Sequence, residues 1–152
     1  MIYLLAVLIG VIAGLRAMTA PAAVSWAAYC GLLPLDGTPL AFLASPWAVG
    51  ILTLFALGEL VADQLPSTPS RKVPIQFGAR LLTGALSGAA IGAAADMLVP
   101  GLVAGIVGAV IGTYAGAALR AAMARMFGQD MPAALIEDAV AIGGAFLIVS
   151  QL

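Results

Sequence analysis

The sequence predicts an all-α protein: a polytopic transmembrane helix bundle of about five spans, of which the first is broken. The composition supports this class, because 63% of the 152 residues are hydrophobic and only 9% are charged. Soluble domains have about 25% charged residues, so too few ionisable side chains are present here to cover a water-soluble globule. The uniformly apolar composition also excludes a disordered chain. The length suits one transmembrane domain over residues 1–152, with about five spans of ~20 residues.

The first apolar run covers Tyr3–Leu33 and is too long for one straight span of ~20 residues. Arg16, Thr19 and Pro21 interrupt it. Because proline lacks an amide donor and clashes with the preceding turn, we predict a break over residues 17–21. The run is then either one long broken helix or a span followed by a re-entrant half-helix. No basic residue precedes the apolar stretch, so we do not expect a cleaved signal peptide.

Four further spans lie between segments rich in turn-forming residues. Their predicted bounds are Pro46–Gln64, Gln76–Leu98, Leu102–Met126 and Asp130 to the C-terminus. Pro34–Ser45 is a predicted loop, and Leu65–Pro74 is another because it holds three prolines within nine residues. We expect a tight turn at Pro100–Gly101, a helix C-cap at Gly128 and a helix N-cap at Asp130.

The basic residues outside the middle of the spans fall into two connections. Arg71 and Lys72 lie in the loop after the second span, and Arg120 and Arg125 lie at the end of the fourth. These connections share one side of the membrane, which the positive-inside rule makes cytoplasmic. The other two connections contain no lysine or arginine. A broken first span puts the N-terminus inside, whereas a re-entrant first segment puts it outside.

Glycines recur at helical spacing in the third and fourth spans, at Gly84, Gly88, Gly92, Gly101, Gly105, Gly108, Gly112 and Gly116. Ridges of small residues let membrane helices approach closely. They predict packing of this helical hairpin inside one subunit, an interface between copies in a homo-oligomer, or the wall of a narrow pore.

Charged side chains inside the apolar spans are the strongest functional signal; they are Arg16, Glu59, Asp63, Arg80, Glu137 and Asp138. Each would cost ~2.5–3.5 kcal/mol at mid-bilayer, so we expect them to face inward, pair or meet water. Two arginines against four carboxylates leave two carboxylates that need a proton, a hydrogen-bond donor, water or a cation. The set is either an ion-pair network that locks the spans together or a polar cavity open to the inside. Asp63 and Arg80 lie near the interface, where we expect them to reach water.

The break in the first run also exposes backbone amides and carbonyls, which need protein or water partners at membrane depth. Broken helices are a recurrent element of transporter sites, and Thr19 and Ser25 could add hydrogen bonds here. Residues 56–63 and 134–141 resemble each other weakly, as an inverted repeat or by chance in an apolar chain.

Three motifs carry a family resemblance: Gly14-Leu15-Arg16-Ala17-Met18-Thr19-Ala20-Pro21, the stretch from Gly58 to Arg71, and Leu135-Ile136-Glu137-Asp138-Ala139. With them the chain resembles the bacterial membrane proteins grouped as domain of unknown function 4126. The middle motif is the most specific, and the resemblance covers most of the chain. It implies a bacterial inner-membrane protein with several spans, and it supplies no activity or catalytic residues. It also favours one shared polar site over scattered ion pairs.

We expect no enzyme, cofactor or metal site, because the chain has no histidine, one cysteine (Cys30) and no nucleophile or phosphate-loop motif. The net charge of −1 argues against a nucleic-acid partner. The leading hypothesis is a small transporter or channel for proton- or cation-linked solute movement. Its substrate or ion site would comprise Arg16, Thr19, Glu59, Asp63, Arg80, Glu137 and Asp138.

In this hypothesis Glu59 and Glu137 bind protons or a cation, and Arg16 contacts an anion or acts as a counter-charge. The alternative is a non-transporting membrane scaffold, or a lipid- or partner-binding protein, whose buried charges are structural. The polar loop residues Ser67, Thr68, Ser70, Arg71 and Lys72 would contact a phosphate or lipid headgroup, or simply lie in water.

Overall fold

The computed structural model describes residues 1–65 and 70–152, and within these ranges all regular structure is helical. Its elements are α1 (Ile2–Leu15), α2 (Thr19–Tyr29), the short 3-10 helix η1 (Ala41–Ala44), α3 (Pro46–Ala62), α4 (Pro74–Ala93), α5 (Leu98–Phe127) and α6 (Asp130–Val149). The prediction of an all-α fold is therefore confirmed. Of the described helices, α5 and α6 are long and apolar enough to cross a membrane.

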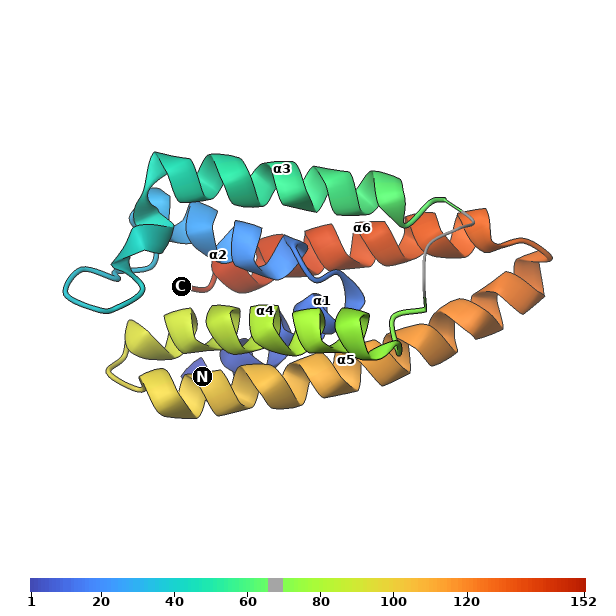
Figure 1. The fold of residues 1–152 in the computed structure, drawn as a ribbon. Helices are drawn as coiled ribbons and strands as arrows, with labels where there is room; N and C mark the ends of the chain where they lie inside the picture. Colours follow the sequence, from blue (N-terminus) through green and yellow to red (C-terminus); the bar gives the residue numbers. More distant parts are fainter. Residues whose placement is uncertain (66–69) are drawn as a thin grey trace.

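The predicted break separates α1 from α2. Arg16 has an extended backbone, with φ −139° and ψ 108°, so the α1 helix ends at Leu15. Pro21 lies in the first turn of α2, where a missing amide leaves no helical hydrogen bond unmade. After the break α2 runs back toward the end of the molecule at which α1 begins (Figure 1). Thus α1 and α2 are two short helices that run in opposite directions, as the re-entrant alternative requires.

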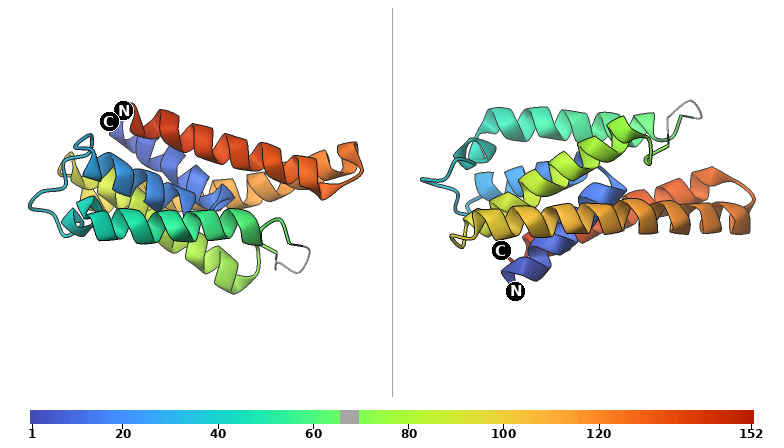
Figure 2. Two further views of the ribbon diagram at one scale, coloured as in Figure 1. Left: turned by 90° about the horizontal axis from the view of Figure 1, so that it is seen from above. Right: turned by 60° about the horizontal axis from the view of Figure 1, so that its bottom comes forward.

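The reversal places both chain termini at one end of the bundle (Figure 2). The connections α2–α3 and α4–α5 lie at the same end, and the connections α3–α4 and α5–α6 lie at the other (Figure 1). The α3 and α6 helices run in opposite directions, as an inverted repeat requires; the repeat itself stays a prediction.

Two helix ends follow the predicted chemistry. The Ser45 hydroxyl accepts a hydrogen bond from the Ala48 amide at 3.1 Å, and Pro46 begins α3. Gly128 ends α5 with φ 71°, a left-handed conformation that glycine adopts without strain. Gln129 rather than Asp130 is the N-cap of α6, because the Asp130 carboxylate instead pairs with Arg120.

The prediction of a turn at Pro100–Gly101 is wrong. The α4 helix ends at Ala93, and the chain turns before α5 begins at Leu98. Asp96 carries the turn with φ 56°, a conformation that a short polar side chain tolerates. Pro100 then lies in the first turn of α5, where proline is accepted, so its presence marked the start of a helix.

Close backbone contact joins α1, α4 and α5. A methyl group on Gly88 would lie 2.7 Å from the Gly105 Cα, and one on Gly14 would lie 2.5 Å from the Thr113 amide nitrogen. The glycine faces predicted for the third and fourth spans are therefore occupied within one chain, between α4 and α5 and between α1 and α5. A homo-oligomer, which stays a prediction, would have to form through other surfaces.

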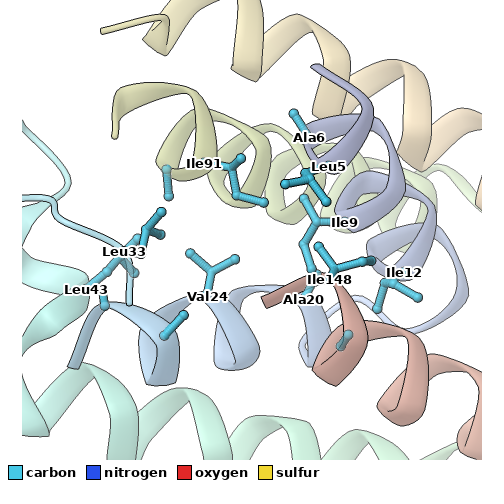
Figure 3. Close-up of a cluster of buried hydrophobic side chains, with 14 of the residues drawn as sticks. Leu5, Ala6, Ile9, Ile12, Ala20, Val24, Leu33, Leu43, Ile91 and Ile148 are labelled. Atoms are coloured by element: carbon cyan, nitrogen blue, oxygen red, sulfur yellow. The ribbon is translucent and has the colours of Figure 1, made fainter. Parts of the chain in front are cut away.

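The apolar core lies between α1, α2, α4 and α6 and includes Ile9, Val24, Ile91 and Ile148 (Figure 3). Large apolar side chains also cover the outside of the bundle, where Leu54 is 71% and Phe146 is 69% exposed. Conversely, the Arg16 side chain is fully buried. So many exposed large apolar side chains around a buried charge are unusual for a water-soluble protein.

Candidate functional site

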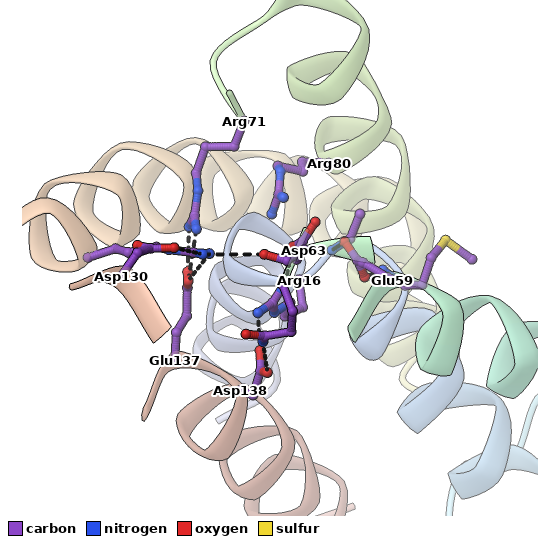
Figure 4. Close-up of polar contacts among 12 residues, drawn as sticks. Arg16, Glu59, Asp63, Arg71, Arg80, Asp130, Glu137 and Asp138 are labelled. Carbon is purple, nitrogen blue, oxygen red and sulfur yellow. Dashed lines mark hydrogen bonds and ion pairs between the residues drawn. The ribbon is translucent and has the colours of Figure 1, made fainter. Parts of the chain in front are cut away.

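Arg16 lies at the centre of a buried polar cluster. The extended backbone at the break carries it into the bundle, where one guanidinium nitrogen donates to Asp63 and the other to Asp138 (Figure 4). Asp63 is the C-cap of α3, and Asp138 lies two turns after the start of α6. One arginine thus links the re-entrant pair to both of these helices.

The cluster also pairs the backbone groups freed by the break. Both carboxylate oxygens of Glu59 accept hydrogen bonds at 2.8 Å, one from the Ala17 amide and one from the Met18 amide. On the other side of the break, the Arg80 guanidinium donates to the Gly14 carbonyl at 2.7 Å. An anion thus lies at the N-terminus of α2 and a cation at the C-terminus of α1, which complements both helix dipoles.

A second group of ion pairs surrounds Glu137, which is 5% exposed. Arg71 donates to its two carboxylate oxygens at 2.5 and 2.8 Å, and Arg120 donates to it at 3.2 Å. Arg120 also pairs with Asp130 at 2.7 Å. Arg120 also donates to the Asp63 carbonyl at 3.4 Å and so connects this group to the pairs of Arg16. The Gln64 amide donates to Asp138 at 3.0 Å.

The expected surplus of two carboxylates is partly wrong. Within the described ranges Glu59 has no arginine at ion-pair distance and accepts backbone amides instead, whereas Glu137 has two arginine partners. Arg71 and Arg120, which the positive-inside rule assigned to the loops, turn inward and pair with Glu137. A long arginine side chain can start at a helix end and still place its charge inside the bundle. Each of the four carboxylates that sequence analysis placed within the spans accepts a hydrogen bond. The expectation that Arg80 reaches water at the interface is also wrong, since its side chain is 3% exposed.

The other predicted residues divide between this cluster and other parts of the fold. Thr19 is buried at the start of α2 and lines an apolar groove between α2, α3 and α6. The Ser25 hydroxyl donates to the Leu43 carbonyl at 2.5 Å, away from the cluster. Lys72 lies over the Tyr114 ring at 5.7 Å from its centroid. Ser67 and Thr68 lie outside the described residues.

A cavity of about 350 Å³ lies next to the cluster, and its lining residues are Asp63, Leu65, Ser70, Arg71, Gln76, Arg80, Ala117, Arg120, Ala121 and Asp130. Three arginines therefore face it with two aspartates. Leu65, Ser70 and Asp130 are exposed, whereas Arg80 is buried, so the cavity opens at the end of the bundle and Arg80 forms its floor.

Sequence reasoning missed Gln64, Arg120 and Asp130 as members of the site. Gln64 and Asp130 lie at helix ends and Arg120 lies two turns before the end of α5, so all three looked like ordinary solvated residues beside a membrane. The sequence did carry one signal for their membership, the near balance of six basic and seven acidic residues. In so apolar a chain, such a balance favours ion pairs between basic and acidic side chains. Within the described ranges, no three histidine, cysteine, aspartate or glutamate side chains are grouped to hold a metal ion.

Comparison with known proteins yields one family. Residues 3–151 match the family model described as Domain of unknown function (DUF4126). No curated protein and no solved structure matches the chain.

Proposed function

The chain belongs to this family of unknown function. From the geometry of the site, we propose that it is a small membrane transporter or channel-like protein. It would move a solute through the polar cavity, with proton or cation linkage at the buried carboxylates. The observation that carries this proposal is that a polar cavity and the break between two half-helices share the same buried cluster. Arg80 and Asp63 line the cavity, and they bond to the Gly14 carbonyl and to the Arg16 guanidinium at the break.

The distribution of side chains supports a multi-pass location in the bacterial inner membrane. The bundle presents large apolar side chains outward and buries the charged side chains of Arg16, Arg80 and Glu137. At 30 residues, α5 is about 45 Å long, more than the ~30 Å of a bilayer core. Its C-terminal end, with Arg120 and Arg125, would extend toward the cytoplasm beside Arg71 and Lys72.

Glu137 is the carboxylate that we propose to exchange protons, because it holds two of the three arginines that face the cavity. Its protonation would weaken the bonds to Arg71 and Arg120 and so make both cations available to a solute. Glu59, which accepts two backbone amides, would instead keep the break intact.

A second candidate is a membrane scaffold in which the charges only hold helices together. The observation that favours it is the completeness of the pairing, since Glu59, Asp63, Glu137 and Asp138 all have donors in the described part of the chain.

The test compares Glu137→Gln with wild type in proteoliposomes. Proton, Na⁺ and K⁺ movement is followed under an imposed pH gradient and membrane potential, and Asp36→Asn, in the α2–α3 loop, is the matched control. If the protein is a transporter, wild type and Asp36→Asn should both show flux. Glu137→Gln should show none while it keeps the wild-type unfolding temperature. Absent flux in wild type, or unchanged flux in Glu137→Gln, would reject the proposed role. Loss of folding in Glu137→Gln while wild type shows no flux would favour the scaffold.

A further inference from the structure

Arg80 differs from the other arginines of the cavity in its partners. Arg71 and Arg120 each pair with carboxylates, whereas Arg80 has none within ion-pair distance in the described ranges. Its one hydrogen bond runs from Nη1 to the Gly14 carbonyl, and its Nε is buried without a partner. A cation that is 97% buried and only partly hydrogen-bonded is costly, so this position calls for a further negative group.

The surroundings of Arg80 fit an anion that enters from the open end of the cavity. Arg71 and Arg120 flank its floor, and Ser70 and Gln76 add neutral hydrogen-bonding side chains. The amide of Gln76 has no hydrogen-bond partner in the described ranges and is therefore available to a ligand. Asp63 and Asp130 are already engaged by Arg16 and Arg120, respectively, which reduces their repulsion of a bound anion.

From these observations we infer that the cavity is an oxyanion site, in which Arg80, Arg71 and Gln76 bind the phosphate group of a small organic phosphate or of a lipid headgroup. The planar guanidinium pairs with two oxygens of such a group at once. The cavity volume of about 350 Å³ is larger than a bare phosphate needs, and Leu65, Ala117 and Ala121 give it an apolar wall for an organic portion. The inference rests on the proposed function in that the bound group would be the solute or a regulator of its movement.

The experiment measures binding by the full chain in dodecyl maltoside micelles, which contain no phosphate. The probes are glycerol 1-phosphate and a short-chain phosphatidic acid, with glycerol and choline as controls, and titration calorimetry is the readout. We expect saturable binding of at least one phosphate probe and of neither control. Binding of glycerol 1-phosphate identifies a soluble phosphate, and binding of phosphatidic acid alone identifies a headgroup; both support the site.

Three variants locate the binding. Arg80→Gln should lower the affinity at least tenfold, and Gln76→Leu should lower it less. Ala117→Leu should block binding by filling the cavity, whereas Arg125→Gln, which removes an exposed charge outside it, should leave the affinity unchanged. If Arg80→Gln fails to fold, the affinities of the folded Gln76→Leu and Ala117→Leu variants decide whether the phosphate binds in this cavity.

Two results overturn the inference: no saturable binding of either phosphate probe, or wild-type affinity in both Gln76→Leu and Ala117→Leu. Neither result depends on solute movement. A protein that binds the probe but shows no flux in proteoliposomes contradicts only the proposed function, and one that moves protons without binding a phosphate contradicts only the oxyanion site.

Discussion

The substitution Glu59→Gln tests how the break between α1 and α2 is stabilised. The native carboxylate accepts the Ala17 and Met18 amides at 2.8 Å each. A glutamine has one acceptor oxygen, so one amide keeps a neutral partner and the other faces an NH₂ group. Losing one charge-assisted bond and leaving a donor unpaired should lower the free energy of unfolding by about 2–4 kcal/mol. Since ~1.4 kcal/mol is tenfold, local opening at α2 should become on the order of 30- to 700-fold more frequent.

Hydrogen exchange with mass spectrometry measures this opening directly. In Glu59→Gln, the amides of residues 17–22 should exchange faster than in wild type, while those of α5 should change little. Asp36→Asn is the control, because Asp36 is exposed in the α2–α3 loop. Wild-type exchange at Ala17 and Met18 together with an unchanged unfolding temperature would refute the assignment of Glu59 as the cap of α2.

Three further predictions concern stability, each measured by thermal or chemical unfolding in micelles. Gly108→Ala should lower the free energy of unfolding by about 1–3 kcal/mol or more, because the new methyl group would overlap the α1 backbone. The control Gly143→Ala should have no such effect, because a methyl group there has no neighbour within 4 Å. Equal effects of the two substitutions would contradict the close contact between α1 and α5. Arg16→Gln should lower the free energy of unfolding by about 3–5 kcal/mol, and adding Asp138→Asn should restore part of that loss. If the losses of the two single variants simply add in the double variant, the ion pair between Arg16 and Asp138 is contradicted. Asp130→Asn should change stability by less than about 1 kcal/mol because that carboxylate is 60% exposed; a loss near that of Arg16→Gln would contradict this.

Local sequence rules predicted the elements whose cause is local. The broken first helix followed from Arg16 and Pro21, and the ends of α3 and α5 followed from Pro46 and Gly128. These features depend on which backbone conformations a residue allows and on which amides it can pair. The turn before α5 was misplaced because Pro100 is compatible both with a turn and with the first turn of a helix.

Features that depend on tertiary contacts were only partly predictable. Burial of charge in an apolar chain required that Arg16, Glu59 and Glu137 find partners, but not which ones. The partners of Glu137 are Arg71 and Arg120, whose sequence positions suggested the membrane surface. The choice between a broken span and a re-entrant pair likewise needed the packing of α1 against α5, which no local pattern contains.

The division between backbone packing and polar attachment has a mechanical consequence. The glycine contacts fuse α1, α4 and α5 into a unit with little room to shear, since their backbones already touch. In contrast, α3 packs chiefly on α2 and η1, and its C-terminal half reaches the break through Glu59 and Asp63. Among the longer helices, α3 is therefore the one with the fewest packing constraints on movement relative to the glycine-packed helices α1, α4 and α5.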